Sequence, residues 1–380
     1  MEGAYAAFGR RPRSPIILIA SGGALLLRVL VFALSAVPCI ASATFLDPLD
    51  QPAEVVSQPA TEPLSAIANT GERLVAVGQH GVIIYADAAG EPWRQSKVPV
   101  SADLTALSFA NRLEGWAVGH GGVILHTADG GVTWVKQLDA RTAGDIAQQY
   151  YETRAASIPE AQRDAVLAQA RELGKEKAEQ PFLDVWFKDQ QEGFVVGTFN
   201  RVFRTADGGK SWVPLIDKTT NPEALHFYAV RGMGDQLYIV GERGGVWRWD
   251  HAQARFVSAN VPYDGSLFGL VVTPDAVLAF GMRGAVFRTV DQGAHWTRIP
   301  TRLDVGIVAG DVCSNADIVL SSQAGDIMVS SDHGASFKLI KTSSRTAVSS
   351  VVSSSQDRLV EIGQSGVHLL PPVCSAVPSK

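Results

Sequence analysis

The residues best suited to chemistry in this sequence lie in turns that follow a glycine. Each turn comes at the end of an apolar run and carries a basic side chain. The side chains concerned are Arg201, Arg243, Arg283, His80 and His120. A guanidinium group binds a carboxylate through two parallel hydrogen bonds, so clustered arginines favour an acidic partner. The alternative is ordinary solvated turn arginines, because Arg201 is displaced by two alignment positions and Glu242 can neutralise Arg243.

Motifs for metal binding, phosphate binding and nucleophilic catalysis are missing from the sequence. The eight histidines form no H-x-x-H pair, and the three cysteines form no C-x-x-C pair. G-x-S-x-G and Walker patterns are also missing. We therefore expect no catalytic residues, no metal and no cofactor.

The elements that position the basic turns recur along the chain. The residues that begin the turns are Gly78, Gly119, Gly197, Gly241, Gly281, Ser322 and Gly363, spaced about 41 residues apart except for one longer step after Gly119. Each repeat contains four short apolar segments, which in the second repeat are 104–110, 115–119, 123–127 and 132–137. Seven such repeats with short strands predict an all-β fold, a seven-bladed β-propeller. One blade cannot bury its own faces, so residues 44–375 are expected to form a single domain.

Four repeats share a second motif near their ends. Thr127-Ala-Asp129-Gly-Gly-Val-Thr-Trp134 fits S/T-x-D-x-G-x-S/T-W/F, as do the segments around Asp207 and Asp332, whereas the segment of Asp291 departs at His295. This pattern resembles the Asp-box, or BNR, repeat. A short carboxylate can accept hydrogen bonds from nearby backbone N–H groups, while glycine supplies positive φ. We interpret Asp129, Asp207, Asp291 and Asp332 as structural residues that close the turn between the third and fourth strands.

Among Asp-box propellers, the chain resembles the photosystem II stability and assembly factor-like family. The resemblance rests on Gly115-Trp-Ala-Val-Gly-His-Gly-Gly122, on Glu192-Gly-Phe-Val-Val-Gly197 and on seven repeats across residues 60–370. It implies an exported, non-enzymatic assembly factor or interaction platform, bound to a membrane transport system or another membrane complex. In this family an arginine patch binds the partner, which is the role expected here for Arg201, Arg243 and Arg283.

The longer step between Gly119 and Gly197 contains an insertion at about 141–180. Ser157-Ile-Pro-Glu160 fits a capping box, and apolar residues follow at helical spacing through Leu173, so the insertion is expected to be helical. It joins two blades on the face that carries the basic turns, with Tyr150 and Tyr151 at its start. Long structured loops often bind partners. The alternative is that the insertion packs only on the blades of the propeller and binds no partner.

The N-terminal segment has the pattern of an export signal. Arg10, Arg11 and Arg13 precede an apolar run from Ile16 to Ile40, and Ala41-Ser-Ala43 fits a signal-peptidase site. Residues 1–43 are thus expected to be removed on export to a periplasm or an equivalent compartment. A retained membrane anchor is the alternative, because the run is long enough to span a bilayer. Cys39 raises a lipoprotein signal, but Val37 and Pro38 fit a lipobox poorly.

Composition narrows the classes of function further. Hydrophobic residues make up 46% of the chain and charged residues 19%, which excludes a disordered protein. The formal net charge of −5 argues against a nucleic-acid partner. We expect a monomer that binds protein. Cys313 and Cys374 could form a disulfide or remain as two buried thiols.

A sialidase-like glycoside hydrolase is the alternative function, since sialidases also carry Asp boxes. Their chemistry needs three convergent arginines, a tyrosine nucleophile and a carboxylate. Thr297-Arg-Ile-Pro300 echoes a sialidase motif, but it follows an Asp box here and precedes the first box in those enzymes. Sialidases also favour six blades.

The last repeat ends at Leu369-Leu-Pro-Pro372 without a clear fourth strand. The segment Ala53–Gln58 is expected to pair there and close the ring, which would remove exposed strand edges.

Overall fold

The computed structural model describes residues 46–90, 92–175, 180–259, 261–340, 346–354 and 358–374. The expected signal segment, 1–43, lies outside these residues. Leu46–Lys380 forms one compact unit, and the fold below is that of this unit. No helix among the described residues is long and apolar enough to cross a membrane.

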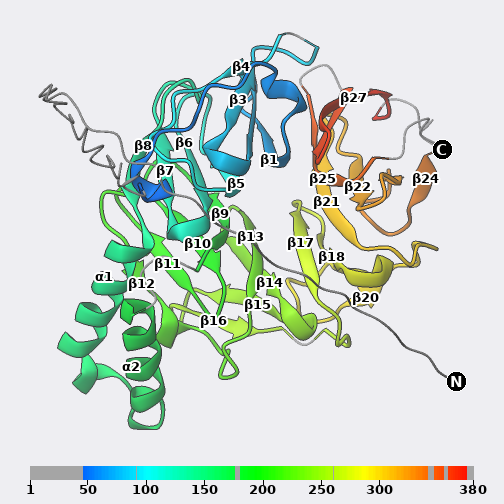
Figure 1. Cartoon of the computed structure of the whole chain (residues 1–380). Coiled ribbons are helices and arrows are strands. Elements are labelled where there is room, and N and C mark those ends of the chain that lie inside the picture. Colours follow the sequence, from blue (N-terminus) through cyan, green and yellow to red (C-terminus); the bar gives the residue numbers. More distant parts are fainter. Residues whose placement is uncertain are drawn as a thin grey trace, which may run out of the picture. The chain divides into compact units, whose positions relative to one another are not determined.

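Seven antiparallel sheets form the unit, in agreement with the seven predicted blades (Figure 1). The first three blades have four strands each: β1 (Leu64–Asn69), β2 (Leu74–Gly78), β3 (Ile83–Ala86) and β4 (Arg94–Gln95); β5 (Leu104–Phe109), β6 (Gly115–Gly119), β7 (Ile124–Thr127) and β8 (Val135–Leu138); β9 (Phe182–Phe187), β10 (Gly193–Gly197), β11 (Val202–Thr205) and β12 (Val213–Pro214). The four segments predicted for the second repeat correspond to β5–β8, with ends that differ by up to three residues.

The remaining blades continue the same order. Their strands are β13 (Phe227–Met233), β14 (Gln236–Gly241), β15 (Val246–Asp250) and β16 (Arg255–Ser258); β17 (Leu267–Val272), β18 (Val277–Gly281), β19 (Val286–Thr289) and β20 (Thr297–Arg298); β21 (Ile307–Val312), β22 (Ile318–Ser322), β23 (Ile327–Ser330) and β24 (Lys338–Ile340); β25 (Val348–Ser353), β26 (Arg358–Gly363) and β27 (Gly366–Pro372). The first strand of each blade contacts the first strand of the next, and β25 contacts β1, so the ring is closed.

The first strand of every blade has a bulge near its start. In blade 1 the pairing with β2 shifts between Leu64 and Ala66, and the same shift recurs in the other six blades. A bulge re-aims the side chain of the extra residue. The first strands of the blades are the inner strands, which contact one another around the central channel of the ring. The bulge therefore redirects the second residue of each inner strand. These residues lie at the end of the channel where the inner strands begin.

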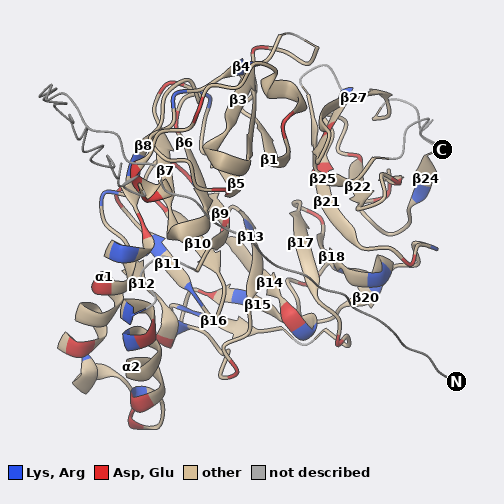
Figure 2. Ribbon diagram, in the orientation of Figure 1, with Lys and Arg blue, Asp and Glu red and all other residues tan. Residues whose placement is uncertain are grey.

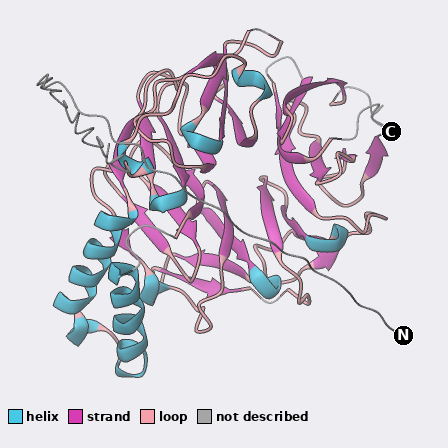
Figure 3. Ribbon diagram, viewed as in Figure 1, coloured by secondary structure: helices cyan, strands magenta, loops and turns pink. Residues whose placement is uncertain are grey.

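Within the described part of the chain, helix occurs only in the insertion and in short 3-10 turns (Figure 3). Helix α1 (Ala140–Thr153) and helix α2 (Glu160–Lys175) confirm that the insertion is helical, and α1 contacts β12. The expected capping box is wrong, because the Ser157 hydroxyl donates to the Arg154 carbonyl (2.8 Å) and α2 begins at Glu160. The short 3-10 turns are η1 (Pro48–Asp50), η2 (Pro59–Thr61), η3 (Gln79–Gly81), η4 (His120–Gly122), η5 (Ala155–Ser157), η6 (Ile216–Lys218), η7 (Glu242–Gly244) and η8 (Met282–Gly284).

The insertion packs on the blades rather than projecting freely. Ala147, Tyr151, Val166 and Leu173 are buried in one hydrophobic cluster with residues of blades 2 and 3, among them Trp116. The Trp116 and Phe187 rings, from neighbouring blades, stack with their centroids 3.4 Å apart. The helices therefore have a fixed position relative to these two blades.

The last blade has three strands among the described residues, and the expected pairing of Ala53–Gln58 with it is wrong. No residue of that segment is in a strand. Its hydrogen bonds go instead to blade 1, where Ala53 N donates to Val98 O (3.2 Å) and Val56 N donates to Gln95 Oε1 (2.9 Å). The Val56 side chain packs against a cluster shared by blades 1 and 7. The segment thus bridges these blades by side-chain packing.

A disulfide joins the last two blades. Cys313, which follows β21, is bonded to Cys374, which follows β27, and their Cα atoms are 5.9 Å apart. The Asn315 side chain also donates to the Cys374 carbonyl (2.6 Å). The end of the three-stranded blade is therefore held to blade 6 by a covalent bond.

Candidate functional site

Three of the five basic turns share a backbone conformation that projects the side chain outward. His80, Arg243 and Arg283 have φ values of 54°, 52° and 54°, in the left-handed region. A glycine follows each of them, and a Cβ on Gly244 or Gly284 would approach a carbonyl oxygen of the next blade to about 2 Å. The turn therefore lies tightly against its neighbour, and the preceding side chain faces solvent.

Arg243 and Arg283 are exposed on adjacent blades, 4 and 5. The Arg243 guanidinium forms an ion pair with Glu223, and both side chains are more than 60% exposed. Among the described residues, none forms a hydrogen bond or an ion pair with Arg283. The positive charge of Arg283 is therefore available to a partner, and that of Arg243 becomes available if Glu223 is displaced. Glu242, expected to neutralise Arg243, instead accepts from the His226 backbone N–H (2.8 Å).

Arg201 differs from the other two arginines because it is buried, with 3% of its surface exposed. Its guanidinium donates to the carbonyl and the side-chain oxygen of Gln180, and it lies over the Phe182 ring at 5.7 Å. These contacts fasten the end of the insertion to blade 3. The structure therefore does not bring the three arginines together as one exposed arc.

The two histidines remain exposed on blades 1 and 2. The backbone N–H groups of His80 and His120 both donate to Asp103, through its side chain and its carbonyl respectively (2.8 Å each). Asp103 lies in the loop that joins these blades. The contact fixes the two turns, and both imidazole rings stay at the surface.

Tyr150 and Tyr151 have different environments. Tyr151 is 1% exposed, and its hydroxyl donates to the Pro214 carbonyl (3.1 Å) and to the Asp217 carboxylate (2.8 Å). Burial and the nearby Asp217 charge raise the pKa of Tyr151 well above its usual range. Tyr150 is half-buried, and the Arg154 guanidinium lies 4.2 Å from its ring centroid. Burial leaves Tyr150, and not Tyr151, accessible to a partner.

Exposed apolar side chains join this face, and sequence reasoning missed them. Phe199 is 47% exposed and Met282 is 40% exposed, each in the turn after the second strand of its blade. The Phe199 ring lies 4.4 Å from the His226 ring, and its carbonyl accepts from Gln169 of α2. In the alignment of the repeats, Phe199 occupies the same position as Arg243 and Arg283. This alignment could have identified Phe199 as a residue of the same face. Figure 2 shows that the adjoining insertion carries charges of both signs.

The Asp-box carboxylates bond within their own turns. Asp207 Oδ1 accepts from the Thr205 hydroxyl (2.8 Å) and from Ser211 N (2.9 Å), and its Oδ2 accepts from the Ser211 hydroxyl (2.6 Å). Asp129 and Asp332 bond in the same way.

In the fourth Asp box, His295 Nδ1 takes the place of that hydroxyl, 2.6 Å from Asp291 Oδ2. The His295 backbone N–H, the Thr289 hydroxyl and the His295 ring hold the pKa of Asp291 well below its usual range. The departure seen in the sequence therefore keeps the geometry of the turn.

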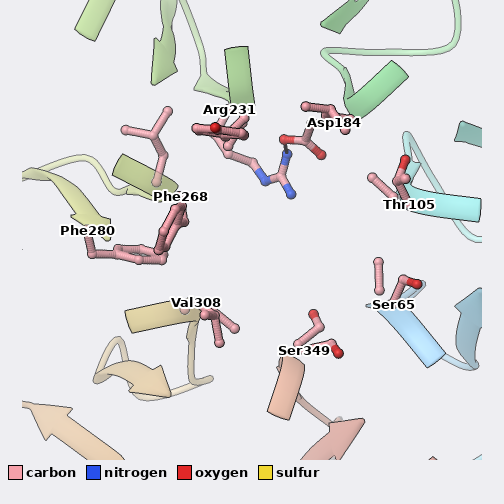
Figure 4. A pocket seen from close by; sticks show the side chains of 18 residues that line it. Ser65, Thr105, Asp184, Arg231, Phe268, Phe280, Val308 and Ser349 are labelled. Atoms are coloured by element: carbon pink, nitrogen blue, oxygen red, sulfur yellow. Dashed lines mark hydrogen bonds and ion pairs between the residues drawn. The ribbon is translucent and has the colours of Figure 1, made fainter. Parts of the chain in front are cut away.

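A cavity of about 160 Å³ lies where the inner strands begin, on the same face as the basic turns. All seven blades line it, and Arg231 is the one arginine in its lining (Figure 4). The described residues that line it include no His, Cys or Glu, and no cluster of metal-ligating residues occurs elsewhere among the residues that the structure describes.

The family model of Photosynthesis system II assembly factor YCF48 matches residues 66–154 and 165–308, more than half of the chain. The chain belongs to this family. The match begins within blade 1 and ends within blade 6, and it includes both the basic turns of blades 4 and 5 and most of the insertion.

Curated relatives and solved structures agree with the family. The chain is 20% identical to the Photosystem II assembly protein Ycf48 of Thermosynechococcus vestitus over 64% of this chain and 73% of the relative. It is 28% identical to the Photosystem II assembly lipoprotein Ycf48 of a Synechococcus species, over 30% of this chain and 35% of the relative.

Solved structures give the fold. YCF48 bound to D1 peptide superposes with a TM-score of 0.60 at 18% identity, covering 87% of this chain and 98% of that one. YCF48 from Cyanidioschyzon merolae superposes with a TM-score of 0.57 at 14% identity, covering 84% of this chain and 97% of that one. These likenesses show that the Ycf48-family chain is a β-propeller.

Proposed function

We propose that this Ycf48-family protein binds a segment of a membrane protein during the assembly of a membrane complex. Family membership is the observation that carries the proposal, together with the solved relative that holds a D1 peptide. The binding surface we assign consists of His80, His120, Tyr150, Phe199, Arg243, Met282 and Arg283. Tyr150 lies in α1 of the insertion, and the other six lie in the turns after the second strands, on one face of the ring.

The chemistry of this surface suits a peptide with acidic and apolar side chains. Arg283 offers an uncompensated guanidinium, and Arg243 could exchange Glu223 for a carboxylate of the partner. Phe199 and Met282 are exposed apolar groups that would gain by burial, and interfaces are enriched in aromatic, Met and Arg residues. Arg201 and Tyr151 support this surface from beneath, through the contacts that hold the insertion to blade 3.

We propose that the protein works outside the cytoplasm as a monomer. The export pattern of residues 1–43 supports this location, and so does the Cys313–Cys374 disulfide, because disulfides persist in oxidising compartments. The Synechococcus relative is a lipoprotein, so attachment to the membrane through a lipid is the alternative to be tested. Mass spectrometry of the protein from its host would show whether the chain begins at Thr44 or is lipidated at Cys39.

A non-enzymatic role is part of the proposal. A sialidase needs three arginines around the substrate carboxylate, and the cavity at the channel end has one, Arg231. Tyr228 lines the same cavity, but burial and the Glu242 charge raise its pKa, whereas a nucleophile needs it lowered. Turnover of a fluorogenic sialoside by the purified protein would overturn this part of the proposal.

The partner can be identified by affinity purification from the native host. The tagged protein is cross-linked in the cell and the captured proteins are identified by mass spectrometry. We expect enrichment of a membrane protein whose exported segment is acidic and apolar, with D1 as one candidate in a photosynthetic host. Recovery of the same proteins with the tag alone would contradict the proposal.

A further inference from the structure

The cavity at the channel end is built by one structural device repeated seven times. In each blade the bulged second residue of the inner strand lines the cavity. These residues are Ser65, Thr105, Leu183, Tyr228, Phe268, Val308 and Ser349. Hydroxyl groups come from blades 1, 2, 4 and 7, whereas apolar side chains come from blades 3, 5 and 6. The hydroxyls of the adjacent blades 7, 1 and 2 therefore form a polar wall, and the adjacent blades 5 and 6 form an apolar wall, whereas Leu183 and Tyr228 lie between them.

Arg231 of β13 reaches into this cavity with part of its guanidinium unused. Its Nη1 donates to the Asp184 carboxylate of blade 3 and to the Val230 carbonyl (2.6 Å). Among the described residues, none accepts a hydrogen bond from its Nε or Nη2. Figure 4 shows the guanidinium in the open space between Thr105 and Phe268. The Nε and Nη2 edge has the two parallel donors that bind one carboxylate.

The partners of Arg231 hold it in this position. Asp184 has a side chain that is 4% exposed, and it also accepts from the Val230 backbone N–H (2.8 Å). Because Asp184 is already bonded to two donors, it fixes the guanidinium from one side. Asp311 of blade 6 acts on Arg231 through its charge, and its carboxylate is bonded to the Ser353 N–H. Asp184 thus holds the guanidinium at Nη1 and leaves its Nε and Nη2 edge without an acceptor among the described residues.

We propose that the cavity binds a short-chain aliphatic monocarboxylate. The carboxylate would accept from Nε and Nη2 of Arg231, whose guanidinium lies between Thr105 and Phe268 (Figure 4). The hydrocarbon chain would lie against Phe268 and Val308 of blades 5 and 6. A volume of about 160 Å³ is well below the roughly 300–1,000 Å³ of sites for drug-sized ligands, so the acid has only a few carbon atoms. The site is independent of the proposed partner surface.

Butyrate is the probe, and butyramide is its uncharged counterpart of the same shape. NMR spectroscopy of the purified protein follows the Arg231 Nε–Hε signal, which is assigned by its loss in the Arg231→Lys variant. We expect butyrate to shift this signal with saturation in the millimolar range, and butyramide to leave it unchanged. In calorimetry, Arg231→Lys should weaken butyrate binding about tenfold or more, because an ammonium group lacks the paired donors. The matched control Arg248→Lys, outside both the cavity lining and the proposed partner surface, should bind butyrate as the wild type does.

Three results would overturn the site: an unshifted Arg231 signal in butyrate, an equal shift in butyramide, or undiminished binding to Arg231→Lys. Lysine keeps the charge that faces Asp184, so the variant should fold, as checked by thermal melting. If the variant does not fold, calorimetry of butyrate and butyramide on the wild-type protein, which needs no assignment, decides the question: binding of neither compound, or equal binding of both, would overturn the site.

Discussion

At the scale of single residues, the aspartates of the four Asp-box turns show how a short motif determines a local structure. Each carboxylate accepts hydrogen bonds from a Ser or Thr hydroxyl two residues earlier and from a backbone N–H four residues later. This role could be predicted from sequence because all of the partners lie within the motif itself. The exchange of a hydroxyl for the His295 imidazole shows that hydrogen-bonding capacity, rather than residue type, is what the turn requires.

Replacement of one Asp-box carboxylate should lower stability measurably. In Asp207→Ala, the Thr205 and Ser211 groups lose their acceptor, and we expect the free energy of unfolding to fall by about 2 kcal/mol. Urea denaturation measures this change. The control Asp164→Ala removes an exposed carboxylate on α2 and should change stability by less than about 0.5 kcal/mol. Equal effects of the two substitutions would contradict the structural role.

Asp311 should make stability depend on pH. Burial raises its pKa from 3.8 to about 6, against the opposing effect of the Ser353 N–H bond. The folded state therefore favours the neutral carboxyl, so this contribution to stability is fully present below about pH 4 and is lost as the pH rises through about 6. Asp311→Asn should be more stable than the wild type by about 1–2 kcal/mol at pH 7.5, since part of the side chain remains accessible to solvent.

The same comparison at pH 4 provides the internal control for Asp311. There the wild-type carboxyl is mostly neutral, so the difference between the two proteins should become small. A difference in unfolding free energy that is the same at both pH values would show that the effect comes from packing and not from the charge.

Burial of Arg201 could not be predicted from its own position in the sequence. Its acceptors belong to Gln180, at the end of the insertion, and the distance between these two residues depends on how the insertion packs. Tyr151 is similar, because its hydroxyl partners Pro214 and Asp217 come from the end of the following blade. Residue type and spacing identified the face, whereas tertiary packing decided which side chains remain on it.

At the scale of elements, the strands could be predicted from the sequence, whereas the pairing of the segment before the first strand could not. Each blade has a buried second strand that ends in a repeated turn, so its position is given by a local pattern, as in Leu74–Gly78 and Val277–Gly281. The segment Ala53–Gln58 carries no such pattern. Its backbone N–H groups donate to Gln95 and Val98 of blade 1 instead of pairing with β27. The sequence alone does not show which of these two blades the segment contacts.

The disulfide should stabilise the last blade, which has three strands among the described residues. The double variant Cys313→Ala, Cys374→Ala should lose about 2–4 kcal/mol of stability, because the bond closes a long loop. Thermal melting with and without dithiothreitol tests this. The reductant should lower the melting temperature of the wild type to that of the variant and leave the variant unchanged. An equal response of both proteins to the reductant would rule out the bond as the cause.

At the scale of the whole molecule, the segment before the first strand links three blades. Leu49 packs in the cluster shared by blades 1 and 2, and Arg141 of α1 binds Asp50 with two hydrogen bonds (2.7 and 2.9 Å). Val56 packs between blades 1 and 7. Packing of Val56 therefore reinforces the contact between β25 and β1 at the junction of blades 7 and 1, whereas Leu49 and Asp50 tie the segment to blades 1 and 2 and to the insertion.

Removal of residues 44–60 should strongly destabilise the protein, since it takes the Leu49 and Val56 side chains from two blade interfaces. The loss of these two side chains alone corresponds to roughly 3–6 kcal/mol. Differential scanning calorimetry measures the change. A double variant, Leu49→Ala with Val56→Ala, should reproduce much of the loss without deleting backbone. Unchanged melting of both proteins would contradict the bridging role.

The central claim is that the face carrying the second-strand turns binds the membrane-protein partner. Its most direct test is the affinity of the captured partner segment for Arg243→Glu, Arg283→Glu, compared with Arg248→Glu, Arg288→Glu as a charge-matched control from the third strands of the same blades. We predict at least a tenfold loss of affinity for the first double variant and less than a twofold change for the control, both proteins being folded by thermal melting. Undiminished affinity of the first variant, or equal losses in both, would contradict the claim.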